Sequence, residues 1–173
     1  MIIWGISANS HDAALAVFVD NELKFASHSE RFSGIKNDAH LNTKLIDYAR
    51  QWGEPDKVVW YERPFRKTLR QLWAGQGWKY CENDVRSYLR RYGIDCPVKY
   101  STHHSSHASA GYYTSGFMDA SVVCIDSIGE FETLSIWQGS ADRLDKYHSQ
   151  GYPHSVGLWY SAMTQRIGLK PNE

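Results

Sequence analysis

Residues 2–27, IIWGISANSHDAALAVFVDNELKFAS, contain three short apolar runs that decide the fold. The runs cover residues 2–7, 14–19 and 23–27, and each has a length and composition typical of a β-strand. Asp20-Asn21, between the second and third runs, favours a tight hairpin turn. We therefore expect a three-stranded meander at the amino terminus.

A helix and a fourth strand are predicted after the meander. Four apolar residues recur at helical spacing: Leu41, Leu45, Ala49 and Trp52. Gly53-Glu54-Pro55 ends this helix, because glycine and proline do not continue it. Residues 57–61 are then typical of a buried strand, which we expect to return to the same sheet.

Two further helices are predicted before residue 98. Their apolar stripes are Phe65, Leu69, Leu72 and Trp73, then Val85, Tyr88, Leu89 and Tyr92. We interpret residues 62–97 as a helical insertion at the surface. Residues 63–99 also carry nine Lys or Arg against three Asp or Glu. A solvated helical face explains this charge, and contact with a polyanionic substrate is the alternative.

A histidine pair marks the next helix. His103 and His107 are four residues apart, so both imidazoles lie on one helix face while His104 points elsewhere. The apolar run 121–125 is typical of a strand, and Asp126 would lie at its carboxyl end. Two imidazoles and one carboxylate suit iron, zinc or manganese. A surface or hydrogen-bonded histidine pair is an equally good interpretation of these residues alone.

Two polar loops are candidate ligand sites. His11-Asp12 lies between the first two predicted strands, and Gly129-Glu130 lies at the start of a second hairpin whose partner strand is residues 133–138. Such loops can present backbone N–H groups to phosphate oxygens, and glycine allows a ligand to approach closely. For a single loop, an ordinary polar turn is the better interpretation. Two such loops in one chain favour a ligand site.

The remaining segments contain a charged cluster and a last helix. Residues 30–38 are rich in charge, and Lys36 could neutralise a phosphate or carboxylate. An exposed ion-pair loop is the alternative. Ser155 is placed to cap a helix that ends at Gly168. The residues that follow Gly168 do not resemble a domain end, so we expect the sequence to be a piece of a longer protein.

Composition predicts one globular domain and excludes several classes. The 173 residues are 42% hydrophobic, with 19 Lys or Arg balancing 19 Asp or Glu, so no global charge attracts nucleic acid or a membrane. Three unevenly spaced cysteines fit neither a disulfide framework nor a Cys-x-x-Cys metal site, which favours a reducing cytoplasm. Signal-peptide and membrane-span patterns are absent from the sequence. We therefore expect a cytoplasmic protein without membrane association.

Six ordered blocks of residues carry a resemblance. They are Gly5-Ile6 with His11-Asp12-Ala13-Ala14-Leu15; Glu30-Arg31-Phe32 with Lys36 and Asp38; His103-His104 with His107-Ala108 and Tyr112-Tyr113; Ile125-Asp126 with Gly129-Glu130 and Thr133; Tyr152-Pro153-His154-Ser155 with Gly157; and Tyr160-Ser161 with Thr164, Gly168 and Pro171-Asn172. In these blocks the chain resembles the carbamoyltransferases of the nodulation and antibiotic-biosynthesis type. Enzymes of this family transfer a carbamoyl group to a hydroxyl.

The resemblance implies a fold. It is the α/β fold of the tRNA threonylcarbamoyl transferases, actin and the sugar kinases: a ribonuclease-H-like mixed sheet with flanking helices. This chain is similar to the first half of a duplicated domain, as the N-terminal part of the carbamoyltransferase domain. The second half and a separate domain that forms carbamoyl adenylate are absent from it. The fragment alone is therefore expected to be inactive.

The resemblance also implies site residues. His103, His107 and Asp126 correspond to metal ligands, with Fe²⁺ expected and Zn or Mn as alternatives. His11 and Lys36 correspond to catalytic residues at the carbamoyl and phosphate end of the site. The expected cofactor-binding residues are His11, Asp12, Lys36, Gly129, Glu130 and Ser155. Ser127 departs from the pattern, because the family often has glycine there.

The implied activity is ATP-dependent O-carbamoyl transfer. Carbamoyl phosphate and ATP would give carbamoyl adenylate, and the acceptor would be a small-molecule hydroxyl. One alternative is the same chemistry on hydroxymethylated DNA or a nucleotide. Another is a non-catalytic, truncated module that binds nucleotide or metal. A homodimer is the expected assembly if the chain self-associates.

Overall fold

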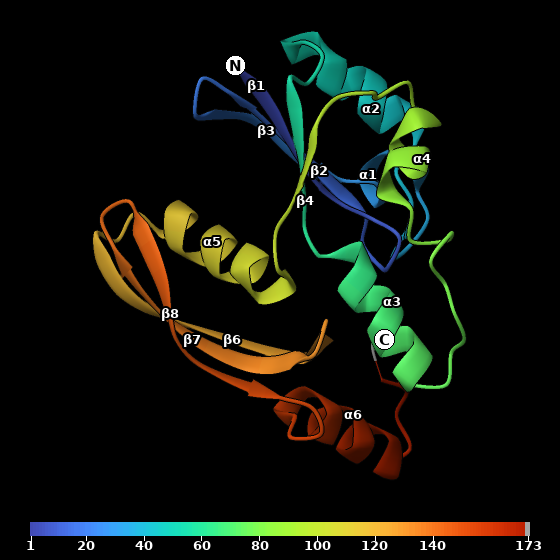
Figure 1. Ribbon diagram of the computed structural model, residues 1–173, viewed down its shortest axis with the longest axis vertical. Helices are drawn as coiled ribbons and strands as arrows, with labels where there is room; N and C mark the ends of the chain where they lie inside the picture. The colour runs from blue at the N-terminus through green and yellow to red at the C-terminus, as the bar shows by residue number, and fades with distance from the viewer. Residues whose placement is uncertain (172–173) are drawn as a thin grey trace. The chain divides into compact units, whose positions relative to one another are not determined.

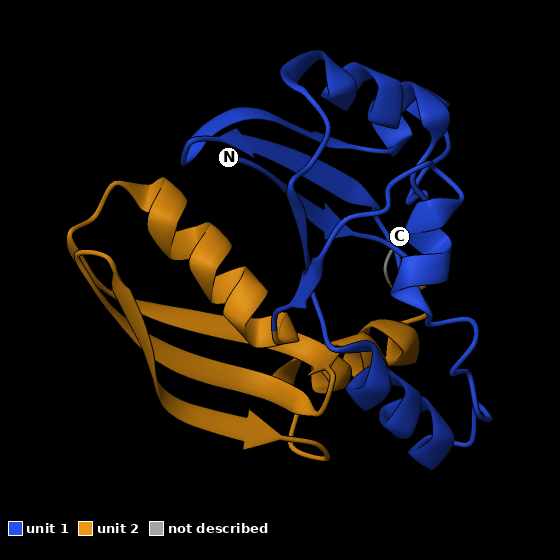
Figure 2. Ribbon diagram, turned by 45° about the horizontal axis from the view of Figure 1, so that its top comes forward, with its two compact units in different colours: residues 1–101 blue, residues 102–173 orange. Residues whose placement is uncertain are grey.

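The computed structural model describes residues 1–171. The chain forms two compact units, Met1–Ser101 and Thr102–Glu173, drawn in blue and orange in Figure 2. Each unit has its own sheet and its own buried cluster, and the single globular domain expected from length and composition stays a prediction. Asn172, from the last block of the resemblance, lies outside the described residues.

Unit 1 contains a five-stranded mixed sheet. Its strands are β1 (Ile2–Ser7), β2 (Ala14–Val19), β3 (Glu22–His28), β4 (Lys57–Trp60) and β5 (Val98–Tyr100), in the spatial order β3-β2-β1-β4-β5. β1, β2 and β3 pair antiparallel, whereas β1, β4 and β5 pair parallel. The predicted meander and the return of the fourth strand to the same sheet are confirmed.

The turn between β2 and β3 follows from its two residues. Asp20 and Asn21 have φ angles of 50° and 68°. Asp and Asn tolerate this left-handed region because their short side chains bond the local backbone, and two such residues form the turn that matches the twist of a hairpin. The dipeptide therefore fixes the pairing of β2 with β3.

The helices of unit 1 begin at recognisable caps. They are α1 (Glu30–Ser33), α2 (Thr43–Ala49), the 3-10 turn η1 (Arg50–Trp52), α3 (Pro64–Trp73) and α4 (Val85–Arg90). The Asn42 side chain accepts from the N–H of Leu45 at 3.0 Å, and Asp84 caps α4 in the same way. Pro64 occupies the first turn of α3, where a missing N–H costs nothing.

The core of unit 1 lies around two fully buried tryptophans, Trp4 and Trp60. α4 belongs to this core, because Val85, Tyr88 and Leu89 are buried in the same cluster. The Tyr88 hydroxyl also accepts from the N–H of Leu41 at 2.8 Å. Thus α3 and α4 connect β4 to its parallel neighbour β5, and α4 packs against the sheet. The description of residues 62–97 as an insertion stays a prediction.

Unit 2 contains a three-stranded antiparallel sheet and two helices (Figure 1). The elements are α5 (His103–Ser115), β6 (Asp119–Gly129), β7 (Glu132–Ser140), β8 (Arg143–Gly151) and α6 (Val156–Arg166), with the strand order β6-β7-β8. α5 buries His104, Ala108 and Tyr112. β8 was not predicted, because most of its residues are polar and exposed and carry no alternating apolar pattern.

None of the helices within residues 1–171 combines the length and apolarity needed to cross a bilayer.

Candidate metal centre

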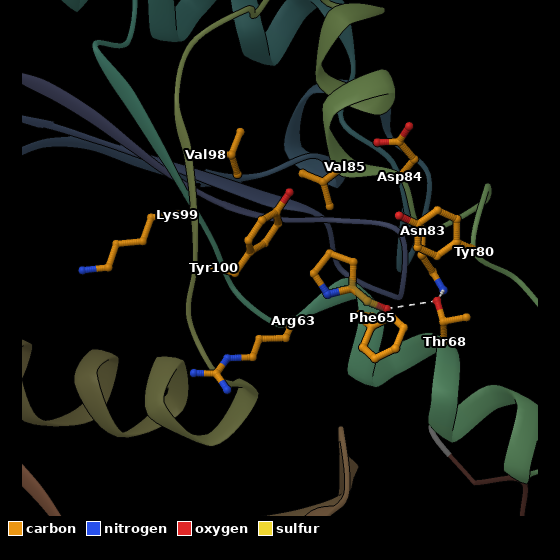
Figure 3. Close-up of a pocket in the computed structure, with 11 residues that line it drawn as sticks. Arg63, Phe65, Thr68, Tyr80, Asn83, Asp84, Val85, Val98, Lys99 and Tyr100 are labelled. Carbon is orange, nitrogen blue, oxygen red and sulfur yellow. Dashed lines mark hydrogen bonds between the residues drawn. The ribbon is translucent and has the colours of Figure 1, made fainter.

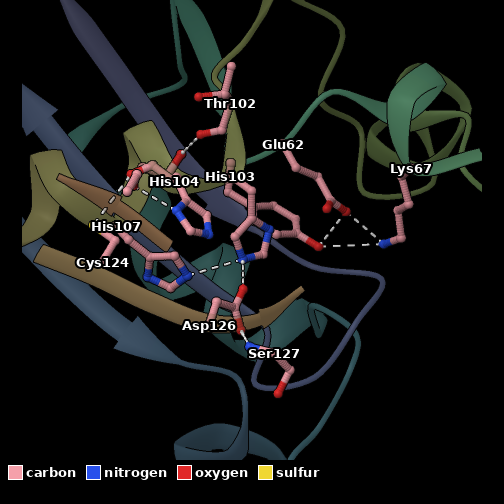
Figure 4. A network of polar contacts seen from close by, with 12 residues as sticks. Glu62, Lys67, Thr102, His103, His104, His107, Cys124, Asp126 and Ser127 are labelled. Atoms are coloured by element: carbon pink, nitrogen blue, oxygen red, sulfur yellow. Dashed lines mark hydrogen bonds and ion pairs between the residues drawn. The ribbon is translucent and has the colours of Figure 1, made fainter. Parts of the chain in front are cut away.

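The first turn of α5 places two imidazoles together. Thr102 caps the helix, its hydroxyl accepting from the N–H of Ser105 at 3.2 Å, so His103 and His107 stand one turn apart on the same face. Their Nε2 atoms lie 3.1 Å apart. Figure 4 shows both rings turned toward Asp126. The predicted pairing of His103 with His107 is therefore present in the structure.

Asp126 reaches the histidines from an irregular part of β6. Regular pairing with β7 stops after Ile125 and resumes only at Gly129. Such an irregularity changes the direction in which side chains point. The prediction that the strand ends at Asp126 is wrong, because β6 continues for three more residues to Gly129. Asp126 Oδ2 lies 3.1 Å from Nε2 of His103, and the N–H of Ser127 donates to Oδ1 at 2.6 Å.

The three side chains form a group with the spacing of metal ligands. All three ligand atoms lie within 4.8 Å of one another, and two of the separations are 3.1 Å. Ligands at about 2.1 Å from one ion, at angles between about 90° and 109°, lie roughly 3.0–3.4 Å apart. The hydrogen bond from His103 lowers the pKa of Asp126, partly offset by burial. The carboxylate is therefore held in the ionised form that a cation requires.

His104 faces away from this group. It is fully buried, and its Nδ1 lies 2.7 Å from the hydroxyl of Ser135, which also accepts from the indole N–H of Trp137 at 2.8 Å. Burial lowers the pKa of His104, so the ring is held neutral where α5 packs against β7. The structure therefore gives His104 a packing role and separates it from its two neighbours in sequence.

Replacement of His104 by alanine is expected to reduce stability without removing metal. The change empties a buried site and deprives Ser135 of a partner, so the free energy of unfolding should fall by about 2 kcal/mol. Urea unfolding measures this loss, and metal analysis of the same sample should match that of the wild type. A variant that unfolds normally but loses its metal would contradict the packing role.

Three residues predicted to bind cofactor lie in the same unit. Gly129 ends β6, and Glu130 occupies the turn to β7 with a φ of 57° and is only 3% exposed. The Ser155 hydroxyl caps α6 by accepting from the N–H of Leu158 at 3.0 Å. It also lies 2.7 Å from the carbonyl oxygen of Ser127. Ser155 is thus engaged in packing next to Asp126.

The other predicted site residues belong to unit 1. His11 and Asp12 lie in the loop between β1 and β2, with the His11 side chain 78% exposed and its Nδ1 2.9 Å from Asp12 Oδ2. Lys36 is exposed on the loop after α1. These two loops lie side by side, because the N–H of Asn9 donates to the carbonyl of Ala39 at 2.8 Å. The structure thus brings the predicted residues together as two groups, one in each unit.

Sequence reasoning missed a buried ion pair at the carboxyl ends of the parallel strands. Glu62 follows β4, and Lys67 on α3 places Nζ 2.7 Å from its carboxylate, as Figure 4 shows. Lys67 also donates to the carbonyl of Asn9 at 2.9 Å. The pair therefore ties α3 to the loop that carries His11. The sequence hides this pair, because Lys67 lies in a basic segment, residues 63–99, whose composition is typical of a solvated helical face.

A cleft of about 590 Å³ opens on unit 1. Figure 3 shows it between the start of α3, the segment before α4 and β5, with Phe65, Tyr80 and Tyr100 among its lining residues. Residues 63–68, 80–85 and 98–100 supply its walls. It contains none of the side chains predicted for the metal or the carbamoyl group.

The fold and the family of the chain are shown by comparison with known proteins. YeaZ from Pseudomonas aeruginosa matches with a TM-score of 0.51 at 10% identity, covering 88% of this chain and 67% of YeaZ. The fold is therefore the ribonuclease-H-like α/β fold of the actin and sugar-kinase class, as predicted. The family model for the carbamoyltransferase N-terminus matches residues 57–173. This chain belongs to the carbamoyltransferase family.

Relatives of this chain occur in distant organisms. The uncharacterized protein sll1178 of Synechocystis is 33% identical over 98% of this chain and 32% of its own length. MJ1051 of Methanocaldococcus jannaschii is 26% identical, over 99% of this chain and 31% of its own length. The nodulation protein NolNO of Sinorhizobium fredii is 24% identical, over 91% and 25%. The chain thus spans about a third or less of these curated relatives.

Proposed function

We propose that this chain is the metal-holding part of an ATP-dependent O-carbamoyltransferase. The observation that carries the proposal is the convergence of His103, His107 and Asp126 in a member of the carbamoyltransferase family. In the proposed reaction, carbamoyl phosphate, water and ATP give carbamoyl adenylate, phosphate and pyrophosphate. The carbamoyl group then passes to the hydroxyl of a small molecule, which loses its proton, and AMP leaves. The match to the nodulation protein NolNO supports the same reaction class.

The donor set indicates which ion the centre would hold. Two neutral imidazoles and one carboxylate suit Fe²⁺, Zn²⁺ or Mn²⁺, and iron is our first choice from the family resemblance. A bound cation would supply positive charge to the phosphate of the adenylate leaving group. His103, His107 and Asp126 would fix the position of that charge. Gly129, Glu130 and Ser155 are proposed to lie along the nucleotide.

Two residues of unit 1 complete the proposed chemistry. His11 is exposed and bonded to Asp12, so it could orient the acceptor hydroxyl or take its proton. The Asp12 carboxylate would hold the His11 ring in one orientation. Lys36 would offset negative charge that develops on the carbamoyl and phosphate oxygens. A cytoplasmic location and a homodimer stay predictions.

The test uses the polypeptide in the full length that its gene encodes. Metal analysis is combined with an assay that supplies carbamoyl phosphate and ATP and measures AMP and pyrophosphate. We expect bound metal and nucleotide turnover, with a labelled carbamoyl group appearing on hydroxyl acceptors. Metal without turnover would favour the non-catalytic module, and a protein with neither would overturn the proposal.

A further inference from the structure

Gly129 lies directly against the ring of His103. A Cβ atom added to Gly129 would lie 2.4 Å from Cδ2 and 2.7 Å from Cγ of that ring, and 3.0 Å from Oδ2 of Asp126. Non-bonded carbon atoms need about 3.5 Å. The His103 ring can therefore occupy its position only because residue 129 has no Cβ atom. A side chain at this position would therefore collide with two of the three candidate ligands.

Neither Gly129 nor His103 can easily move away from the other. Gly129 is paired with Glu132 at the closed end of the β6–β7 hairpin, so its backbone is fixed by the ladder. His103 is fixed by the capped start of α5. A methyl group on Gly129 would have to turn or shift the imidazole by about 1 Å to restore a 3.5 Å contact. That shift would move Nε2, the atom that faces His107 and Asp126.

A second glycine holds the backbone of Asp126. Gly157, in the first turn of α6, would place a Cβ 2.6 Å from the nitrogen of Ser127 and 2.7 Å from the carbonyl carbon and oxygen of Asp126. These are backbone atoms, which cannot rotate away. The Ser155 hydroxyl lies 2.7 Å from the carbonyl oxygen of Ser127 and 3.2 Å from that of Asp126. The start of α6 thus packs directly on the segment that carries this ligand.

We propose that Gly129 and Gly157 are positioning residues of the metal centre, Gly129 for the His103 ring and Gly157, with Ser155, for the Asp126 carboxylate. The inference rests on the proposed metal site. It gives Gly129 and Ser155 a function besides the nucleotide contacts expected of them. Groups that orient metal ligands typically contribute 10–100-fold to metal affinity. The glycines would act in this way by permitting close packing.

The chain provides a matched control for Gly129. Gly139 lies on β7 of the same sheet, and its Cβ would lie 2.3 Å from the ring of Tyr112, which stands on the same helix as His103. Alanine at either glycine therefore collides with an aromatic ring to a similar degree. Only the ring beside Gly129 belongs to the metal centre. Both substitutions should lower the melting temperature.

The decisive measurement is Zn²⁺ affinity, by competition with a chromogenic chelator and without nucleotide. Gly129→Ala and Gly157→Ala are each expected to weaken binding about tenfold or more. Gly139→Ala should stay within about twofold of the wild type, since its clash leaves the ligands in place. Circular dichroism checks each fold. If both glycine variants fail to fold, Ser155→Ala replaces them in the test, because this substitution adds no atoms. We expect it to bind Zn²⁺ more weakly than the wild type.

The outcomes separate this inference from the proposed function. A wild-type protein that binds no Zn²⁺, Fe²⁺ or Mn²⁺ overturns the metal centre itself. A wild type that binds Zn²⁺ beside folded Gly129→Ala and Gly157→Ala variants that bind equally well overturns the positioning role alone. The positioning role is also overturned if Gly139→Ala loses as much Zn²⁺ affinity as Gly129→Ala, because general destabilisation would then explain both losses. Unchanged Zn²⁺ binding by Ser155→Ala would overturn the positioning role of Ser155.

Discussion

Replacement of His107 by alanine is expected to remove the metal from the protein while leaving the fold intact. His107 is exposed, so its loss should change the free energy of unfolding by only about 0.5 kcal/mol. Its Nε2 lies 3.1 Å from Nε2 of His103, and in the proposed metal centre it would supply one of the three donors. Loss of a direct ligand should weaken binding more than the 10–100-fold typical of indirect partners.

The measurement is metal content after dialysis against a weak chelator. The wild type should retain about one ion per chain and His107→Ala only background metal. His148→Ala is the matched control, because His148 is an exposed histidine on β8, away from the ligand group. Full metal retention by His107→Ala would remove His107 from the ligand set. Equal loss in His148→Ala would indicate that the metal is bound non-specifically.

Replacement of Lys67 by methionine is expected to give the largest loss of stability. Lys67 is 6% exposed and Glu62 is 3% exposed, so the ion pair is withdrawn from water. Methionine has similar bulk but leaves the Glu62 carboxylate buried without this cation. Breaking such a pair from one side costs about 3–5 kcal/mol. The Tyr61 hydroxyl cannot replace the lost positive charge. It donates a hydrogen bond to Glu62 but stays neutral, since burial and the Glu62 charge raise the pKa of Tyr61.

Urea unfolding of two further variants tests the electrostatic origin of this loss. The double variant Glu62→Gln/Lys67→Met removes both charges and should recover much of the stability. Lys79→Met is the exposed comparison, because Lys79 pairs with Glu82 at 3.3 Å in solvent and such pairs contribute about 0–1 kcal/mol. A loss below about 1 kcal/mol in Lys67→Met would show that the buried pair contributes little.

The sequence predicted the elements that have a local signal. Apolar runs located the strands of the amino-terminal meander, helical spacing located α2, α3 and α4, and the Ser155 cap located α6. β8 escaped prediction, because an exposed polar strand buries too little apolar surface to leave a pattern. The end of β6 was misplaced for a related reason. The interruption between Ile125 and Gly129 is a property of pairing with β7, which is not encoded in any short window.

The features of the candidate site also divide into one that local sequence predicts and several that only tertiary contacts produce. Helix periodicity by itself determined that His103 and His107 share a face, because a turn of helix is a local structure. Only the tertiary structure decided that Asp126 meets them, that His104 is buried against Ser135, and that Gly129 lies against the His103 ring. These contacts join α5 to β6 and β7, so they depend on how a helix packs on a sheet and on one irregularity in strand register. Neither is visible in the spacing of residues along the chain.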